Sequence, residues 1–160
     1  MHTSRLRLRP FCASDRAAFG QFVDDPAYRR YLGRDHPDLD AFMTNNLAPE
    51  PGREFSWVIC AASTDVPIGS VFLGVAADPA EAEAACLMSS EAWGNGYATE
   101  ATRAVIAFGF ETLGLDRVVA RADAQNAASI RAMEKLGMRP DAAARTDDVL
   151  YAVSRADWPA

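Results

Sequence analysis

The 160-residue sequence lacks a hydrophobic run of about 20 residues, the length needed to cross a membrane. Its first ten residues alternate charged side chains with leucine, and they contain no continuous apolar segment of the kind that signal peptides carry. We therefore expect no membrane association and a cytoplasmic location.

Residues that form covalent or metal cross-links are also scarce. The three cysteines, Cys12, Cys60 and Cys86, are odd in number and are not spaced closely as in zinc or redox motifs. We expect them to be reduced and mostly buried. The two histidines, His2 and His36, are too few and too isolated for a metal site or a catalytic triad. The sequence therefore predicts no metal.

Positive charge is not in excess. The sequence has 16 lysine and arginine residues against 22 aspartate and glutamate residues, which gives a formal net charge of −6. Binding to nucleic acid needs clustered basic residues that contact phosphate groups, whereas the basic residues here are scattered. We therefore expect no nucleic-acid partner. An acidic surface would suit a cationic partner, although most acidic domains are simply soluble.

The apolar residues are numerous and periodic enough for one globular domain over residues 1–160. Hydrophobic residues make up 49% of the sequence, and a chain of this size buries about two thirds of the surface that it exposes when unfolded. Their spacing predicts strands over 5–11, 55–62, 67–75, 84–89, 117–122 and 149–153, a weaker strand over 139–144, and helices over 14–24, 28–33, 38–47, 98–113 and 126–137. Helix and loop remain alternatives for residues 76–85. This order predicts an α/β domain of the α+β kind, with a central mixed, mostly antiparallel sheet flanked by helices.

Residues 89–100, SSEAWGNGYATE, join an apolar run to a helical pattern through two glycines, Gly94 and Gly96. Glycine carries no side chain, and the first amide groups of a helix have no partners, so backbone N–H donors and the positive end of the helix dipole can face an anion. This pattern predicts a site for a phosphate-bearing cofactor. A tight turn that needs glycine only for its dihedral angles is the alternative. A nicotinamide dinucleotide is less favoured, because Thr99 stands where that fingerprint has its third glycine.

Two motifs in this order carry a family resemblance. Residues 93–101, WGNGYATEA, followed by residues 126–138, NAASIRAMEKLGM, resemble the GNAT superfamily of acyl-CoA-dependent N-acetyltransferases, and more narrowly its branch of RimJ/RimL-type ribosomal-protein N-terminal acetyltransferases. Residues 3–11 and 150–152, with a late Trp158, match the same branch, so the resemblance covers nearly the whole chain. It implies a GNAT fold in which the strand before the glycine loop is splayed. It also implies acetyl-CoA as co-substrate, without a metal, and a primary amine as substrate, either a protein N-terminus or a small molecule.

The resemblance also assigns the cofactor site. The loop residues that would surround the coenzyme A pyrophosphate are Trp93, Gly94, Asn95, Gly96, Tyr97 and Ala98, with Thr99 adding a hydroxyl group. Backbone groups of Met88 and Ser89 would bond the pantetheine arm as an added strand does, and an amide there would stabilise negative charge on the thioester oxygen. Asn126 matches the family asparagine that meets the pantetheine amide. An ordinary helix N-cap is the alternative for Asn126, and one side chain could do both.

The catalytic groups are less clearly marked. Met133 stands seven residues after Asn126, where many GNAT enzymes have a tyrosine acid, and methionine cannot donate a proton. RimL-like members resemble this chain in a serine three residues after the asparagine, so Ser129 is the candidate that stabilises the departing thiolate; the alternative is a local helical bond. As general base, Glu83 aligns with a family glutamate and Glu54 precedes another strand, although both fit solvated surface carboxylates.

Two functions from different classes remain open at this point. The first is an enzyme that moves an acetyl group from acetyl-CoA to an amine by direct attack. The second is a non-catalytic acyl-CoA-binding module on the same fold, which the missing tyrosine makes plausible. The sequence does not name the acceptor, because the irregular residues 28–53 would shape its pocket. The oligomeric state also stays open, with a homodimer as one option.

Overall fold

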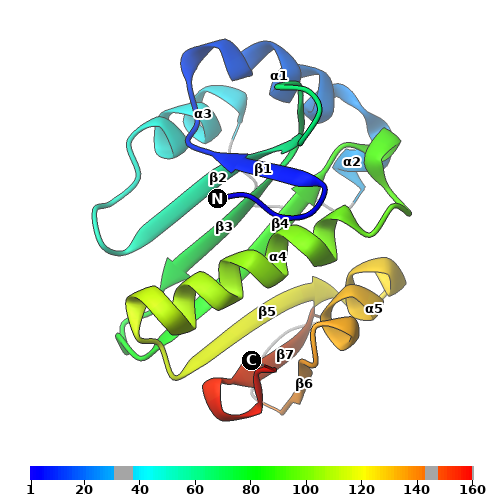
Figure 1. The fold of residues 1–160 in the computed structure, drawn as a ribbon. Helices are drawn as coiled ribbons and strands as arrows, with labels where there is room; N and C mark the ends of the chain where they lie inside the picture. Colours follow the sequence, from blue (N-terminus) through cyan, green and yellow to red (C-terminus); the bar gives the residue numbers. More distant parts are fainter. Residues whose placement is uncertain (31–37, 143–147, 160) are drawn as a thin grey trace.

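The computed structural model describes residues 1–30, 38–142 and 148–159. Within these residues, seven strands form one sheet in the order β1-β2-β3-β4-β5-β7-β6 (Figure 1). The strands are β1 (Leu6–Arg9), β2 (Glu54–Ala61), β3 (Pro67–Val75), β4 (Glu81–Met88), β5 (Arg117–Asp123), β6 (Arg139–Asp141) and β7 (Asp148–Ser154). The β4–β5 pair is parallel, and the other neighbouring pairs are antiparallel. The predicted mixed, mostly antiparallel sheet is confirmed.

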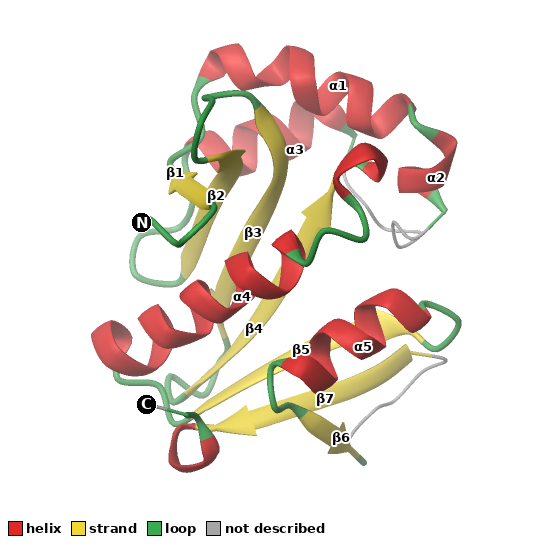
Figure 2. Cartoon of the chain, turned by 45° about the vertical axis from the view of Figure 1, so that its right-hand side comes forward, coloured by secondary structure: helices red, strands yellow, loops and turns green. Residues whose placement is uncertain are grey.

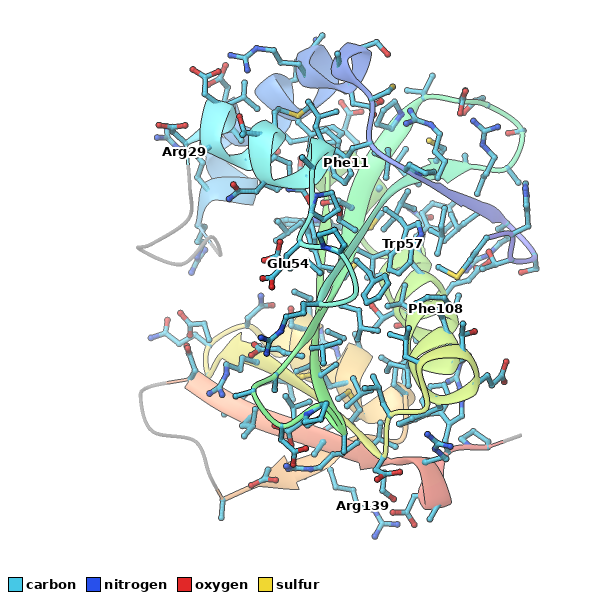
Figure 3. The ribbon with its side chains drawn as sticks, turned by 90° about the vertical axis from the view of Figure 1, so that its left-hand side faces the viewer. Phe11, Arg29, Glu54, Trp57, Phe108 and Arg139 are labelled. Atoms are coloured by element: carbon cyan, nitrogen blue, oxygen red, sulfur yellow. The ribbon has the colours of Figure 1, made fainter. Side chains whose placement is uncertain are left out.

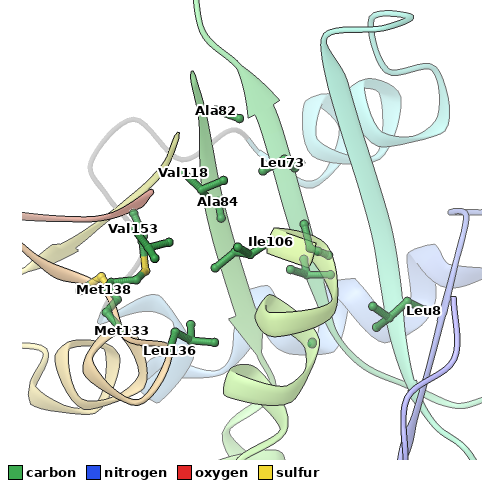
Figure 4. Close-up of a cluster of buried hydrophobic side chains, with 14 of the residues drawn as sticks. Leu8, Leu73, Ala82, Ala84, Ile106, Val118, Met133, Leu136, Met138 and Val153 are labelled. Carbon is green, nitrogen blue, oxygen red and sulfur yellow. The ribbon is translucent and has the colours of Figure 1, made fainter. Parts of the chain in front are cut away.

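Helices cover both faces of this sheet (Figure 1). They are α1 (Arg16–Asp24), α2 (Pro26–Arg29), α3 (Leu39–Leu47), α4 (Tyr97–Phe108) and α5 (Ala127–Lys135). Helix α4 crosses one face, where its buried Val105 and Ile106 pack with Leu73, Ala82 and Ala84 of the sheet (Figure 4). On the other face, α1 and α3 bury phenylalanine rings in a second cluster with β2. The glycine loop that precedes α4 is therefore anchored to the larger core.

The parallel pair opens into a splay. Within the described residues, β4 and β5 pair from Glu81↔Arg117 to Glu83↔Val119 and then separate, as Figure 2 shows. Residues 84–88 of β4 thus leave an open edge of about 16 Å at the usual rise per strand residue. At the closed end, the Arg117 guanidinium contacts the carboxylates of Glu81 and Asp141. The splayed strand before the glycine loop is confirmed.

Some predicted boundaries are wrong. Strand β4 begins at Glu81 instead of residue 84, because Ala82 is completely buried in the larger core and Glu81 is paired with Arg117. Within residues 76–85, the first five residues form a loop, as one of the two alternatives predicted, and residues 81–85 are the first part of β4. The predicted helix over 98–113 is α4 followed by a π-helical turn, η3 (Gly109–Leu113). The helix predicted over 28–33 and the strand predicted over 139–144 lie partly outside the described residues.

Candidate functional site

The glycine loop has the backbone shape that its sequence predicts. After Met88, a short 3-10 helix, η2 (Ser90–Ala92), leads to Gly94 and Gly96, whose φ angles are 78° and 76°. Such positive values favour glycine over any residue with a side chain. A Cβ atom at Gly94 would meet nothing within 4 Å, so the backbone there is open to an approaching ligand. Helix α4 begins at Tyr97, directly after Gly96.

Side chains fix the orientation of two peptide groups in this loop. Asn95 Nδ2 donates to Trp93 O at 3.1 Å, and Asn95 O accepts from Arg5 Nη1 at 2.9 Å. In a trans peptide the carbonyl oxygen and the next N–H point in opposite directions. The two contacts therefore turn the N–H groups of Gly94 and Gly96 away from these partners. An anion could be bound by both groups at the start of α4.

Met88 presents its backbone to the open edge of β4. Ser89 N donates to Ile68 O of β3 at 2.9 Å, and in an antiparallel ladder successive residues direct their backbone groups to opposite sides. The N–H and C=O of Met88 therefore point toward the splay. Trp93 Nε1 already donates to Met88 O at 3.0 Å, which leaves the Met88 N–H as the donor facing the gap. Of the two predicted backbone contacts, Met88 thus faces the splay, while the N–H of Ser89 bonds β3.

Asn126 and Ser129 lie at the other side of the splay. Asn126 follows β5 and Met88 ends β4, so both stand at the open end of the V that these strands form (Figure 2). Asn126 Oδ1 accepts from Ser129 N at 3.1 Å and caps α5, as predicted. This bond uses the amide oxygen and leaves Nδ2 as a donor. Ser129 is half-buried, and within the part of the chain that the structure describes its hydroxyl group has no hydrogen-bond partner, so it can bond a ligand.

Met133 is part of the larger hydrophobic core. Its side chain is 5% exposed and packs in the core between α5 and the sheet (Figure 4). The position where many GNAT enzymes have a tyrosine is therefore filled by a core methionine here.

Glu83 and Glu54 flank one glycine on the opposite face of the sheet from α4. Both are Cα partners of Gly74, Glu54 on β2 and Glu83 on β4, so their side chains leave the same face. Figure 3 shows Glu54 on the other side of the sheet from Trp57. The Glu83 side chain is 45% exposed and its Oε2 lies 3.3 Å from Nε of Arg121. The structure therefore places Glu83 beside the closed end of the splay, in a solvated ion pair.

Cys86 lies on the open part of β4, but its thiol is not poised to react. Burial raises the pKa of Cys86 to about 12, although a hydrogen bond with Thr102 of α4 opposes this rise. The group is thus a neutral thiol at physiological pH. Because a thiolate is the nucleophilic form, this residue is unsuited to carry an acetyl group.

Sequence reasoning missed Arg5 and Glu100 as parts of this site. From the sequence, Arg5 is one residue of the strand predicted over 5–11, and Glu100 is one residue of the helix predicted over 98–113. In the structure Arg5 Nη2 lies 2.6 Å from Glu100 Oε2, beside the glycine loop. No local pattern signals this pair, because the two residues are far apart in the chain. Both residues do lie in segments that carry the family resemblance, Arg5 in residues 3–11 and Glu100 in residues 93–101.

The described residues contain neither a metal-ligand cluster nor a helix that is both long and apolar enough to span a membrane. The described residues do bring together the glycine loop, the open edge of β4, and Asn126 with Ser129 at the start of α5.

This chain is similar in sequence and structure to known acetyltransferases. Residues 5–139 match the acetyltransferase (GNAT) domain family. An uncharacterized N-acetyltransferase, p20, of Bacillus licheniformis is 28% identical over 149 residues, which cover 88% of this chain and 83% of that protein. The crystal structure of an acetyltransferase from Agrobacterium tumefaciens has a TM-score of 0.84 and 28% identity, with 97% of this chain and 94% of that chain covered. RimJ of Mycobacterium smegmatis, solved in complex with CoA-disulfide, shares the fold with a TM-score of 0.81 at 18% identity, over 98% of this chain and 88% of that one.

Proposed function

Because the chain belongs to the GNAT acetyltransferase family, we propose that it transfers the acetyl group of acetyl-CoA directly to a primary amine. The observation that carries this proposal is the open edge of β4, which ends at Met88 and continues into the glycine loop. An extended pantetheine arm can add to such an edge as a strand does. The loop and the start of α4 then provide N–H donors for the diphosphate.

The residues around the splay fit the chemistry of direct transfer. The amine nitrogen forms a bond to the acetyl carbon as the C–S bond breaks, so the nitrogen loses a proton and the thiolate gains one. The Met88 N–H faces the gap and can stabilise negative charge on the thioester oxygen. Ser129 Oγ supplies a donor for the departing sulfur. Glu83 is the candidate base, directly or through water. The neutral Cys86 thiol argues against an acetylated enzyme intermediate.

The acceptor that we favour is a protein N-terminal amine, as in the RimJ/RimL branch. This choice is supported by residues 3–11 and by Ser129 at its place after Asn126, both of which resemble that branch. A small-molecule amine is the alternative acceptor. The free thiols of Cys12, Cys60 and Cys86 support a reducing compartment such as the cytoplasm as the place of the reaction.

Thiol release from acetyl-CoA across a panel of amines tests the proposal. The panel contains peptides that begin with alanine or serine, polyamines and aminoglycosides, with N-acetylated peptides as the matched controls that have no free terminal amine. We expect faster thiol release with free-amine peptides and an acetylated product of the expected mass. Tight coenzyme A binding by calorimetry, with no amine that accelerates release, would instead establish the non-catalytic acyl-CoA-binding module.

A further inference from the structure

Arg5 of the short segment before β1 reaches across to the glycine loop. Its Nε donates to Glu100 Oε2 at 2.7 Å, its Nη1 donates to Asn95 O at 2.9 Å, and its guanidinium lies 4.8 Å from the centre of the Tyr97 ring. These three contacts are all made to residues of the loop or of the first turns of α4. The Arg5 side chain is therefore fixed in place, although it is 50% exposed.

The contact to Asn95 O sets the peptide group between Asn95 and Gly96. Because this peptide is planar and trans, an oxygen held toward Arg5 turns the Gly96 N–H to the opposite side. The flanking Gly94 and Gly96 have few steric restraints of their own, so this peptide could otherwise adopt other orientations. A loop that is already held in its binding orientation loses less conformational entropy when an anion binds.

Glu100 is the second part of this arrangement. Its carboxylate lies in α4, within a turn of the N-terminus, where a free negative charge would oppose a diphosphate at the same helix end. The structure surrounds it with donors: Thr3 Oγ1 at 2.6 Å, Ser4 Oγ at 3.0 Å and Arg5 N at 2.9 Å, besides the guanidinium. These partners, together called the N-terminal clamp, balance the charge and hold it toward the N-terminal segment.

From this geometry we infer that Arg5 is a positioning residue for the diphosphate of acetyl-CoA, acting through the Asn95–Gly96 peptide and through Glu100. The inference rests on the proposed function, because it concerns how the same loop holds the same co-substrate. Arg5 is near the N-terminus, far along the chain from the glycine loop. In this role its side chain contacts neither the reacting atoms nor, of necessity, the ligand.

Kinetics with two acetyl donors test this role. Acetyl-CoA carries the diphosphate and acetyl-pantetheine does not, so a defect confined to the loop affects only the first donor. For Arg5→Gln we expect the KM for acetyl-CoA to rise about tenfold. This factor corresponds to the energy of one hydrogen bond with a charged group. We expect kcat with acetyl-CoA to stay within about twofold of the wild-type value, and we expect the same of kcat/KM with acetyl-pantetheine.

Arg7→Gln is the matched control. Arg7 lies on the adjoining β1 and pairs with the exposed Asp65, not with the glycine loop. Arg7→Gln should leave the kinetic constants with acetyl-CoA and with acetyl-pantetheine unchanged. Arg5→Lys keeps the charge but cannot reach Glu100 and Asn95 O with a planar fork, so its KM for acetyl-CoA should lie between those of the wild type and Arg5→Gln. This milder variant also serves if Arg5→Gln folds poorly.

The outcomes separate the two proposals. A wild type that neither binds coenzyme A nor consumes acetyl-CoA refutes the proposed function, and the role of Arg5 with it. A wild type that uses acetyl-CoA, together with Arg5 variants whose KM for acetyl-CoA and coenzyme A affinity by calorimetry equal those of the wild type, refutes the role of Arg5 alone. Equal losses with both donors would show a general structural role and would also overturn the inference.

Discussion

Gly69 of β3 lies directly across the ladder from Met88 of β4, and there is no room for a side chain between them. A Cβ atom at residue 69 would lie 2.4 Å from Leu87 O and 2.8 Å from Met88 Sδ. The methionine side chain can move, but the carbonyl oxygen belongs to the backbone of β4. The close approach of these two strands therefore fixes the position of the strand end that leads into the glycine loop.

Gly69→Ala should push the end of β4 away from β3 and damage the cofactor site. We expect a loss of about 2 kcal/mol in the free energy of unfolding, as for other overpacked cores, or roughly 4 to 8 °C in Tm for a chain of this size. Coenzyme A affinity should fall as well. Gly74→Ala is the control on the same strand, because a Cβ atom there meets nothing within 4 Å. Scanning calorimetry measures Tm and titration calorimetry measures coenzyme A affinity for both variants. Equal changes at the two positions would contradict the prediction.

Local sequence patterns predicted the parts of this site that depend on neighbours in the chain. The N-cap at Asn126 and the positive φ angles of Gly94 and Gly96 follow from residues within one turn or loop. The pair of Arg5 and Glu100 could not be predicted in this way, because it depends on how β1 is placed beside α4.

The start of β4 was mispredicted for the same kind of reason. The alternating glutamates and alanines at residues 81–84 have low strand propensity on their own. Burial of Ala82 beneath α4 and the ion pair of Glu81 with Arg117 override this local preference. The resemblance supplied the splay itself, which no local pattern encodes, because the separation of two strands is a property of the whole sheet.

Asn126→Ser separates the two roles that we assign to Asn126. Serine retains an N-cap acceptor for Ser129 N, so Tm should change little, whereas Asn126→Ala should cost about 1 kcal/mol through loss of the cap. Both variants lack the Nδ2 donor, and both should raise the KM for acetyl-CoA. Thermal unfolding and steady-state kinetics check this. If Asn126→Ser had the wild-type KM, Asn126 would be a cap and nothing more.

Ser129→Ala should lower kcat while leaving coenzyme A affinity near that of the wild type. The lost hydroxyl would stabilise sulfur mainly as negative charge develops there, and one such donor typically contributes about a hundredfold. The cap contact involves the backbone N–H of Ser129, so it survives the change. Ser129→Thr keeps a hydroxyl and should recover part of the activity. Equal losses in turnover and coenzyme A affinity would rule out the role in thiolate stabilisation.

Glu83→Gln should reduce kcat/KM at neutral pH by about a hundredfold if Glu83 accepts the proton of the amine. The comparison is Glu54→Gln, because Glu54 flanks the same Gly74 from the other side and leaves the same face of the sheet. We expect Glu54→Gln to remain active. The kcat/KM values of both variants over a pH range are the measurement. A loss confined to Glu54→Gln would instead assign the base to Glu54.

Glu100 should make the stability of the fold depend on acid pH. Burial by itself would raise the pKa of this carboxyl, but hydrogen bonds from Thr3, Arg5 and Ser4 outweigh burial and lower it from 4.5 to about 2. A group whose pKa is lower in the folded than in the unfolded chain stabilises the fold at pH values above its pKa in the unfolded chain. This contribution is lost as the pH falls from about 4.5 toward 2. It amounts to about 3 kcal/mol for such a shift. Its side chain is 15% exposed, so solvent screens it little.

Glu100→Gln removes this titration. The variant should be less stable than the wild type at pH 7, and the difference in Tm between the two should shrink as the pH is lowered to 3. Glu111→Gln is the control, because it removes one negative charge from an exposed position just after α4. The Tm of Glu111→Gln should vary with pH in the same way as the Tm of the wild type. Thermal unfolding of the three proteins between pH 7 and pH 3 makes the measurement. Parallel curves for wild type and Glu100→Gln would show that the Glu100 carboxylate, which the N-terminal clamp surrounds, does not control acid stability. Removing its charge would then lower the free energy of unfolding by the same amount at pH 7 and at pH 3.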